Sequence, residues 1–305
     1  MEFVKELFEK YEIRKNKKQR TQFIDWVKEI ATNKGWEFNI QDGVIGTRNI
    51  IIGNPDKAKV IYTAHYDTCA KMIVPNFITP KNFLVYLLYQ IIICFLLFVP
   101  IIAFDTIFVI LFPDLVELSF LISYVLLLVI LWLMMAGPAN KHTANDNTSG
   151  VATILGLIFK FDPEDEVALI LFDYEEIGLV GSSVFASKHK DIVKNTLVVN
   201  FDCVSDGETM LFVLNKKTKN LMDTFKESYE SNDKVTTDVV CKGVFYPSDQ
   251  VQFKKGIGVC SMKKNKLFRS GYIDRIHTSK DTVFREENIK FLIDGSYKLY
   301  KNLTK

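Results

Sequence analysis

The sequence lacks the features that mark several classes of protein. Its five cysteines are odd in number and widely spaced, with no Cys-x-x-Cys pair, so neither a disulfide framework nor a cysteine-type zinc site is expected. This usage fits a reducing compartment. The net charge of +2 lacks the basic excess of a protein that holds nucleic acid. With 48% hydrophobic and 24% charged residues, the composition excludes a disordered chain, a collagen and a coiled coil.

One long segment lacks basic residues altogether. Residues 82–140 contain no Lys or Arg and only three acids, Asp105, Asp114 and Glu117. The apolar runs 83–104 and 119–136, at about 1.5 Å per residue, are long enough for a hydrocarbon core of roughly 30 Å. They predict two membrane-spanning helices, the first either continuing past Pro100 or breaking near Asp105. The alternative is a buried helical hairpin in a soluble core or dimer interface, but such helices usually carry charge on one face.

A hairpin returns the chain to the side of the membrane that it left. Residues 1–81 and 141–305 can therefore form one domain, with 82–140 as a transmembrane insert. The connector between the two apolar runs carries only acids, whereas Lys81 precedes the insert and Lys141 follows it. By the positive-inside rule we expect a multi-pass protein of the cell membrane, with two spans and with both termini and the folded domain in the cytoplasm.

Outside the insert, short apolar runs alternate with helical patterns. Nearly continuous apolar runs bounded by polar residues predict strands buried on both faces at 60–64, 167–172 and 197–201. Helical periodicity predicts helices at 22–33, 150–161, 182–193, 221–231 and 287–302. This alternation is typical of an α/β fold in which helices cover a mixed or parallel sheet.

Histidines and acids fall at the ends of these elements. They are, in chain order, His65, Asp67, Asp146, Glu175, Glu176, Asp202 and His277. Ligands bind beyond the carboxyl ends of strands in open α/β sheets, so we expect these side chains to share one crevice. Two imidazoles and three carboxylates suit two divalent metal ions, with one carboxylate and a water between them. Zinc is the first expectation, although such a site also accepts cobalt or manganese, and the extra acid of Glu175–Glu176 can serve as a general base.

Five motifs, taken in order, resemble those of the co-catalytic di-zinc aminopeptidases, zinc exopeptidases that share their fold with glutaminyl cyclases. They are His65-Tyr66-Asp67, Asn145 to Gly150, Glu175 to Ser182, Asn200-Phe201-Asp202 and Ile276 to Thr282. Each motif alone is weak, whereas five in order across most of the chain outside the insert are specific. The resemblance implies an α/β fold with a three-layer mixed sheet flanked by helices, into which the two-helix transmembrane hairpin is inserted.

The resemblance also implies a role for each residue. The metal ligands would be His65 and Asp202 for one Zn²⁺ ion, Glu176 and His277 for the other, and Asp146 as the bridge. Glu175 would be the catalytic base that takes the proton of a water activated by both metals. Asp67 would orient His65.

Two substitutions and the insert depart from the family pattern. Asn145 stands where the family usually has a second Asp, which leaves the ligands intact because that residue is not one of them. In the stretch Tyr246-Pro247-Ser248-Asp249-Gln250, which resembles the family's Ser-Asp-His stretch near the substrate pocket, Gln250 replaces the usual His. Tyr246 and Asp249 are therefore pocket candidates, but the specificity of family members cannot be transferred. The hairpin replaces a short loop between the first two ligand motifs.

These expectations lead to a membrane-anchored zinc metallo-aminopeptidase, a hydrolase that removes N-terminal residues from peptides at the cytoplasmic membrane face. The hairpin would anchor the enzyme or bring in apolar peptides that partition into the bilayer. One alternative is a glutaminyl cyclase-like acyltransferase, in which Asp146, Glu176 and His277 would hold a single zinc. The other is a non-catalytic membrane scaffold, against which the complete ligand set argues. No role is expected for His142 and His189, and the cysteines are expected to be buried thiols.

Overall fold

A computed structural model describes all 305 residues and contains one eight-stranded sheet in the order β1-β2-β4-β3-β5-β8-β6-β7. The strands are β1 (Phe38–Asp42), β2 (Arg48–Ile52), β3 (Val60–His65), β4 (Val167–Phe172), β5 (Leu197–Phe201), β6 (Thr209–Val213), β7 (Thr236–Val240) and β8 (Gly256–Met262). The central strands β4, β3, β5 and β8 are parallel, whereas β2 pairs with β4 and β6 with β8 in antiparallel fashion. The sheet is therefore mixed.

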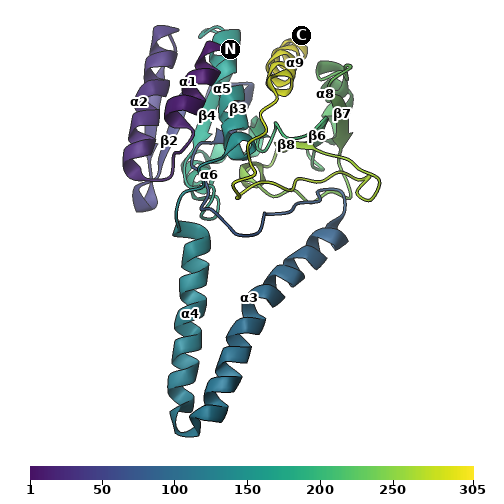
Figure 1. Ribbon diagram of the computed structural model, residues 1–305. Coiled ribbons are helices and arrows are strands. Elements are labelled where there is room, and N and C mark those ends of the chain that lie inside the picture. Colours follow the sequence, from purple (N-terminus) through teal and green to yellow (C-terminus); the bar gives the residue numbers. More distant parts are fainter.

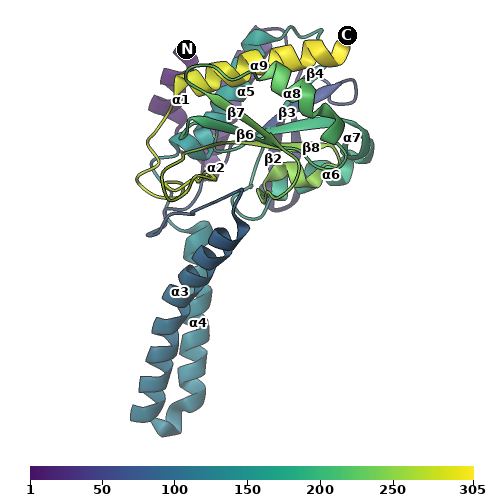
Figure 2. The same cartoon turned by 90° about the vertical axis from the view of Figure 1, so that its right-hand side faces the viewer.

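Helices cover both faces of this sheet, as Figures 1 and 2 show. A core of 41 buried residues joins one face to α1 (Glu2–Tyr11), α2 (Lys17–Asn33), α5 (Ser149–Lys160), α8 (Met222–Ser228) and α9 (Glu286–Thr304). A second core of nine buried residues joins the other face to α6 (Val180–Lys188) and α7 (Lys190–Asn195). The expected three-layer α/β fold is confirmed.

Strand β3 shows why the central strands are almost continuously apolar. Tyr62 and Ala64 belong to the larger core and Ile61 to the smaller one, so successive side chains are buried on opposite faces. The three predicted strands correspond to β3, β4 and β5, and the structure extends β3 by one residue to His65.

The secondary structure departs from expectation in three places. The helix predicted at 182–193 is split into α6 and α7 where His189 leaves helical geometry, with φ −116° and ψ 61°. Helix α2 begins at Lys17 rather than at residue 22, because Asn16 and Gln19 form a capping box there. Helix α1 was not predicted from the sequence, nor were the strands β1, β2, β6, β7 and β8.

The insert forms two long apolar helices, α3 (Phe83–Leu111) and α4 (Val116–Ala136), joined by the short helix η2 (Pro113–Leu115). They project from the domain and diverge towards it from a common tip at η2 (Figure 1). Both are long and apolar enough to cross a membrane, and hardly any of their residues are buried, so they are not core helices of this domain. Helix α3 continues through Pro100 and through Asp105, whose carboxylate accepts hydrogen bonds from Ser119 and Ser123 of α4.

Candidate metal centre

The polar side chains singled out in the sequence lie at the carboxyl edge of the parallel strands. His65 ends β3, Asp202 follows β5, and Glu175–Glu176 follow β4. Asp146 lies in the turn before α5, and His277 lies in the loop between β8 and α9. All of these except His65 line a cavity of about 230 Å³, whose wall also includes Asn76, Ile78, Tyr246 and Pro247.

Asp146 lies between the two histidines. Its Oδ1 is 3.3 Å from His65 Nε2, and its Oδ2 is 3.1 Å from His277 Nε2. Asp202 Oδ1 is 3.7 Å from the same nitrogen of His65, and Glu176 Oε2 is 3.3 Å from that of His277. The structure thus brings all five expected ligands together in two groups that share Asp146.

The spacing of these donors fits divalent metal ions. Two ligands that lie about 2.0–2.2 Å from one zinc ion at a tetrahedral angle are roughly 3.3–3.6 Å apart. The four nitrogen-to-oxygen distances run from 3.1 to 3.7 Å. Glu176 Oε1 is buried without any hydrogen-bond partner, which is costly unless a cation pairs with it. Imidazole and carboxylate donors suit zinc, and also cobalt or manganese.

Burial and mutual charge shift the protonation of these groups. Burial raises the pKa of Glu176 to about 8 and that of Glu175 well above its usual range. Burial alone would lower the pKa of His277, but the charge of Glu176 and the contact with Asp146 raise it to about 9. Burial would raise the pKa of Asp146, but its hydrogen bonds with His277 and His65 lower it. Metal ions compete with these bound protons, so metal affinity should fall at acid pH.

Asp67 positions both halves of the site. Its Oδ1 accepts a hydrogen bond from the backbone N of Glu175 at 3.0 Å, and its Oδ2 accepts one from that of Glu176 at 3.2 Å. The same carboxylate lies 3.5 Å from His65 Nδ1, and the Asp67 carbonyl oxygen lies 3.2 Å from that nitrogen. Asp67 therefore contacts His65 and also holds the turn that carries both glutamates.

A further carboxylate, to which the sequence analysis gave no role, supports Asp146. Asp281 accepts hydrogen bonds from the backbone N of Asn145 at 2.8 Å and from that of Asp146 at 3.0 Å. Asn145 Oδ1 in turn accepts from the backbone N of Ser205 and of Asp206, shortly after Asp202. Asp281 belongs to the same sequence motif as His277, and this is the feature of the sequence that could have identified it.

The two pocket candidates differ in position. Tyr246 lines the cavity and donates its hydroxyl to the carbonyl oxygen of Asp202 at 3.0 Å. Asp249 is fully buried outside the cavity wall, neither of its carboxylate oxygens has a hydrogen-bond partner, and burial raises its pKa to about 7. Gln250 ties this segment to β5, because its side chain donates to the Tyr246 carbonyl and accepts from Asn200 Nδ2.

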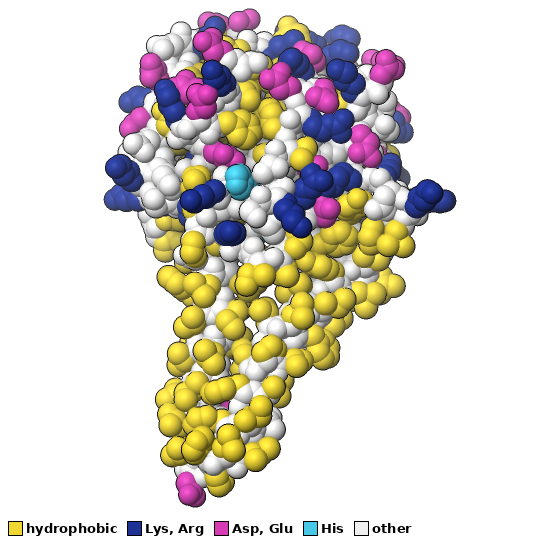
Figure 3. All heavy atoms as spheres, in the orientation of Figure 1, with side chains coloured by type: hydrophobic (Ala, Val, Ile, Leu, Met, Phe, Trp, Pro, Cys, Tyr) yellow, Lys and Arg dark blue, Asp and Glu magenta, His cyan; other side chains and the backbone are white.

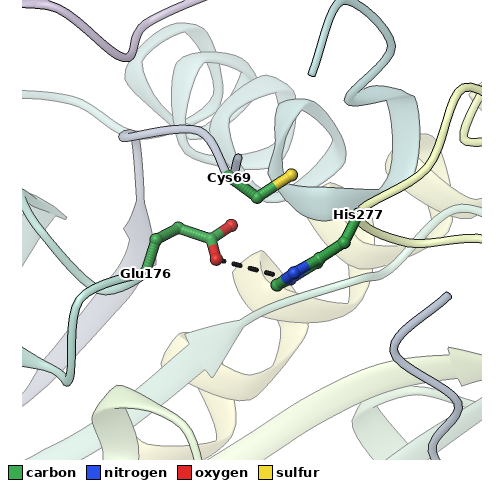
Figure 4. Close-up of side chains that lie close together, drawn as sticks. All are labelled: Cys69, Glu176 and His277. Carbon is green, nitrogen blue, oxygen red and sulfur yellow. Dashed lines mark ion pairs between the residues drawn. The ribbon is translucent and has the colours of Figure 1, made fainter. Parts of the chain in front are cut away.

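Cys69 lies at the site, although the sequence predicts only a buried thiol there. Its Sγ, a carboxylate oxygen of Glu176 and a ring nitrogen of His277 all lie within 4.8 Å of one another (Figure 4). Cys69 follows Asp67 by two residues, and this closeness to the first motif could have identified it from the sequence. The expectation of burial is wrong for Cys94, which is exposed, and for Cys241, which is half-buried.

The segments that connect the hairpin to the domain also touch the site. Ala70 and Ala139 pair as an antiparallel bridge, and Met72 N donates to the His277 carbonyl at 2.7 Å. Asn140 donates from its backbone N to the Cys69 carbonyl and from its side chain to the Thr278 carbonyl. Both ends of the hairpin are therefore hydrogen-bonded to residues next to expected ligands.

Comparison with known proteins places this chain in a family. Residues 131–291, more than half of the chain, match peptidase family M28. The fold is similar to the Legionella pneumophila LapA aminopeptidase, with a TM-score of 0.59 and 14% identity, covering 99% of this chain and 70% of that one. It is also similar to the Porphyromonas gingivalis glutaminyl cyclase, with a TM-score of 0.61 and 14% identity, covering 100% and 96% of the two chains. A comparison with curated protein sequences gives no match.

A third similar structure is a leucine aminopeptidase precursor from Bacteroides thetaiotaomicron, with a TM-score of 0.56 and 13% identity, covering 98% of this chain and 94% of that one. The mixed sheet flanked by helices is a zinc exopeptidase-like fold. The chain belongs to peptidase family M28. The expected family resemblance is therefore confirmed. At such low identities the solved structures show the fold alone, and that fold is shared by aminopeptidases and glutaminyl cyclases.

Proposed function

We propose that this protein is a membrane-anchored metallo-aminopeptidase that hydrolyses the N-terminal peptide bond of peptides. The observation that carries the proposal is the position of Asp146, whose two oxygens face His65 and His277. A carboxylate shared by two donor groups suits a pair of divalent ions, most simply Zn²⁺. Ions bound by these residues would polarise the scissile carbonyl and supply a nucleophilic water.

The chain's own residues suit the remaining tasks. Glu175 lines the cavity beside the ligand Glu176, so its carboxylate can accept the proton of the attacking water and deliver it to the leaving amine. Asp67 fixes the turn that carries Glu175 and the ring of His65. Asp281 holds the backbone of Asp146 in place, so the shared carboxylate does not depend on an exposed loop.

An assay with the full-length, detergent-purified and zinc-loaded protein tests this proposal. The protein should release single amino acids from unblocked peptides, lose this activity with a chelator and regain it with Zn²⁺. The same peptides with an acetylated N-terminus are the control and should stay intact. Failure to release amino acids from any unblocked peptide of a broad panel would contradict the proposal.

The first alternative is a glutaminyl cyclase-like acyltransferase with one zinc at Asp146, Glu176 and His277. His65 and Asp202 form a second donor group, which favours a centre with two metal ions over one with a single zinc. Elemental analysis should therefore find two ions per chain, and His65→Ala should lose one of them. A single tightly held zinc that His65→Ala leaves unchanged, together with ammonia release from peptides that begin with Gln, would favour the cyclase. A non-catalytic scaffold would show neither activity.

We further propose that α3 and α4 cross the cell membrane and that the catalytic domain and both termini are cytoplasmic. Both apolar segments, Phe83–Leu111 and Pro113–Ala136, are long and apolar enough to span a bilayer. Basic and acidic residues lie at opposite ends of the hairpin, since Lys15 Nζ donates to the Met135 carbonyl near the end of α4, whereas Asp114 lies at the tip. Figure 3 shows Lys and Arg side chains on the domain just above the hairpin. This charge distribution supports the cytoplasmic orientation.

A further inference from the structure

We propose that the edge of the domain around the cavity lies on the bilayer surface, and that the enzyme takes the N-termini of peptides whose following residues are embedded in the membrane. This inference deepens the proposed aminopeptidase activity and rests on it and on the proposed hairpin. The partner surface is the lipid bilayer that surrounds α3 and α4.

Exposed apolar side chains outside the hairpin concentrate at this edge. Val44 and Ile45 lie in the turn before β2, which is at the carboxyl edge because Arg48 N donates to Asp173, the residue after β4. Ile73, which is fully exposed, lies between β3 and α3, and Leu267, which is 80% exposed, lies in the loop after β8. Single exposed apolar residues are ordinary, but these four lie at the edge of the sheet where the segments leading into and out of the hairpin also lie.

The cavity wall leads directly to the hairpin. Ile78 lines the cavity and lies in the segment that runs into the first residue of α3, Phe83. Phe245, next to the cavity-lining Tyr246, packs on the first turn of α3, with ring centroids 5.3 Å from Phe83 and 5.6 Å from Tyr86. A peptide that leaves the cavity between Ile78 and Phe245 therefore passes onto the apolar surface of α3.

Aromatic contacts hold the loop of Leu267 against the same helix. Phe77 packs on Tyr89 of α3 at 5.2 Å and on Phe268 at 5.5 Å between ring centroids. Tyr89 also donates its hydroxyl to the Pro75 carbonyl at 2.6 Å. Because these contacts fix the cavity wall to the hairpin, the depth at which the helices sit in the bilayer also sets the height of the cavity above it.

The test uses the full-length protein in lipid vesicles with peptides anchored in the same vesicles. Each peptide has the same N-terminal residues, a polar spacer of different length and an apolar helix of about 20 residues. A site on the bilayer surface should cleave the peptide with the shortest spacer at least as fast as the one with the longest. A site held away from the membrane would cleave only the long-spacer peptides, because a flexible spacer must then bridge the gap. That outcome would overturn the inference.

Variants at the edge give a second measurement. Ile73→Asp and Leu267→Asp should lower cleavage of the short-spacer peptide about 5- to 10-fold while leaving a soluble peptide of the same N-terminal sequence unaffected, because each removes apolar surface that the headgroup–acyl boundary would bury. Phe159→Asp is the matched control, because Phe159 is exposed near the end of α5 that points away from the site. Equal effects of all three variants would contradict the inference. If no peptide is cleaved, the proposed activity itself fails.

A separate observation concerns Cys69, which we infer to be a further ligand of the metal ion held by Glu176 and His277. The Cys69 Sγ belongs to the same compact group of donors as these two residues, and the side chain is buried (Figure 4). Glu176 Oε1, in the same group, is buried and has no partner. The group around His65 and Asp202 contains no sulfur, so the two metal positions would differ in chemistry. On binding, the thiol would lose its proton to solvent.

A thiolate ligand makes this position prefer zinc, cobalt or cadmium over manganese. Loading the metal-free protein with Co²⁺ should produce a sulfur-to-metal charge-transfer band in the near ultraviolet. The band should vanish in Cys69→Ser and persist in Cys260→Ser, a buried thiol outside every donor group. A wild-type protein that holds Co²⁺ without this band, or a Cys69→Ser variant that keeps it, would overturn the assignment. A protein that binds no Co²⁺ would refute both the metal centre and this ligand.

Discussion

Glu175 and Glu176 are neighbours in the sequence but have different surroundings. Both side chains line the cavity and form a donor group with His65, but only Glu176 also approaches His277, with its Oε2 3.3 Å from Nε2. The backbone N of each is held by the same carboxylate, that of Asp67. One fixed turn therefore presents a ligand and a base side by side.

We predict that Glu175→Gln lowers kcat about 10² to 10⁴-fold without loss of metal, because the amide keeps the size of the side chain but cannot accept a proton. The measurement is kcat together with bound metal on the same preparation. Glu176→Gln is the matched comparison and should lose metal. Full metal with a near wild-type kcat in Glu175→Gln would show that Glu175 is not the base.

Asp249 offers a prediction about pH. Burial raises its pKa to about 7, so the carboxyl contributes most to stability below about pH 4 and loses this contribution as the pH rises through about 7. Asp249→Asn does not titrate. We compare the melting temperatures of Asp249→Asn and wild type by thermal unfolding of the metal-free proteins. The melting temperature of the variant minus that of wild type should increase from acid to alkaline pH. The exposed Asp223→Asn is the control and should show no such trend. A constant difference for Asp249→Asn would contradict the prediction.

At the scale of the elements, the ends of the hairpin are hydrogen-bonded to the edge of the sheet that carries the candidate metal centre. Asn140, four residues after α4, is fully buried and its side chain donates to the carbonyl oxygen of Thr278, next to His277, at 2.9 Å. Its backbone N donates to the carbonyl of Cys69. Movements of the hairpin relative to the domain are therefore expected to reach the metal centre.

We predict that Asn140→Ala lowers the free energy of unfolding by about 1–3 kcal/mol, because the Thr278 carbonyl loses a buried donor. It should also weaken metal binding, since the loop of His277 loses one of its supports. Thermal unfolding and metal titration measure the two effects. Asn39→Ala on the exposed surface of β1 is the control. If both variants behave alike, the junction does not support the site.

At the scale of the whole molecule, the proposed orientation puts the tip of the hairpin and the catalytic domain on opposite sides of the membrane. We predict that an impermeant thiol reagent applied to intact cells labels Asp114→Cys, at the tip, and does not label Lys190→Cys, at the start of α7. Cys94→Ser and Cys241→Ser remove the background from the two native thiols that are not buried. Labelling of Lys190→Cys alone would reverse the orientation, and labelling of both would argue against a spanning hairpin.

Much of this organisation was readable from the sequence, for local reasons. Strands β3, β4 and β5 are buried on both faces and are therefore apolar runs, and the hairpin is evident because residues 82–140 carry no basic side chain. The five expected ligands stand out because they follow buried strands or precede helices in ordered motifs. The edge strands β1 and β7 were missed because few of their residues are buried, as in β1, where only Gln41 is buried. Strands β2, β6 and β8 were missed although nearly all of their residues are buried.

Only the tertiary structure determined which distant segments meet. Asp281 reaches the backbone of Asp146 across 135 residues, and Cys69 joins Glu176 and His277 from the other side of the insert. The break between α6 and α7 and the closeness of the cavity wall to α3 were likewise not visible in the sequence. The physical reason is that periodicity along a chain reports how each segment is buried, whereas the partner that buries it is chosen by packing among segments far apart in sequence.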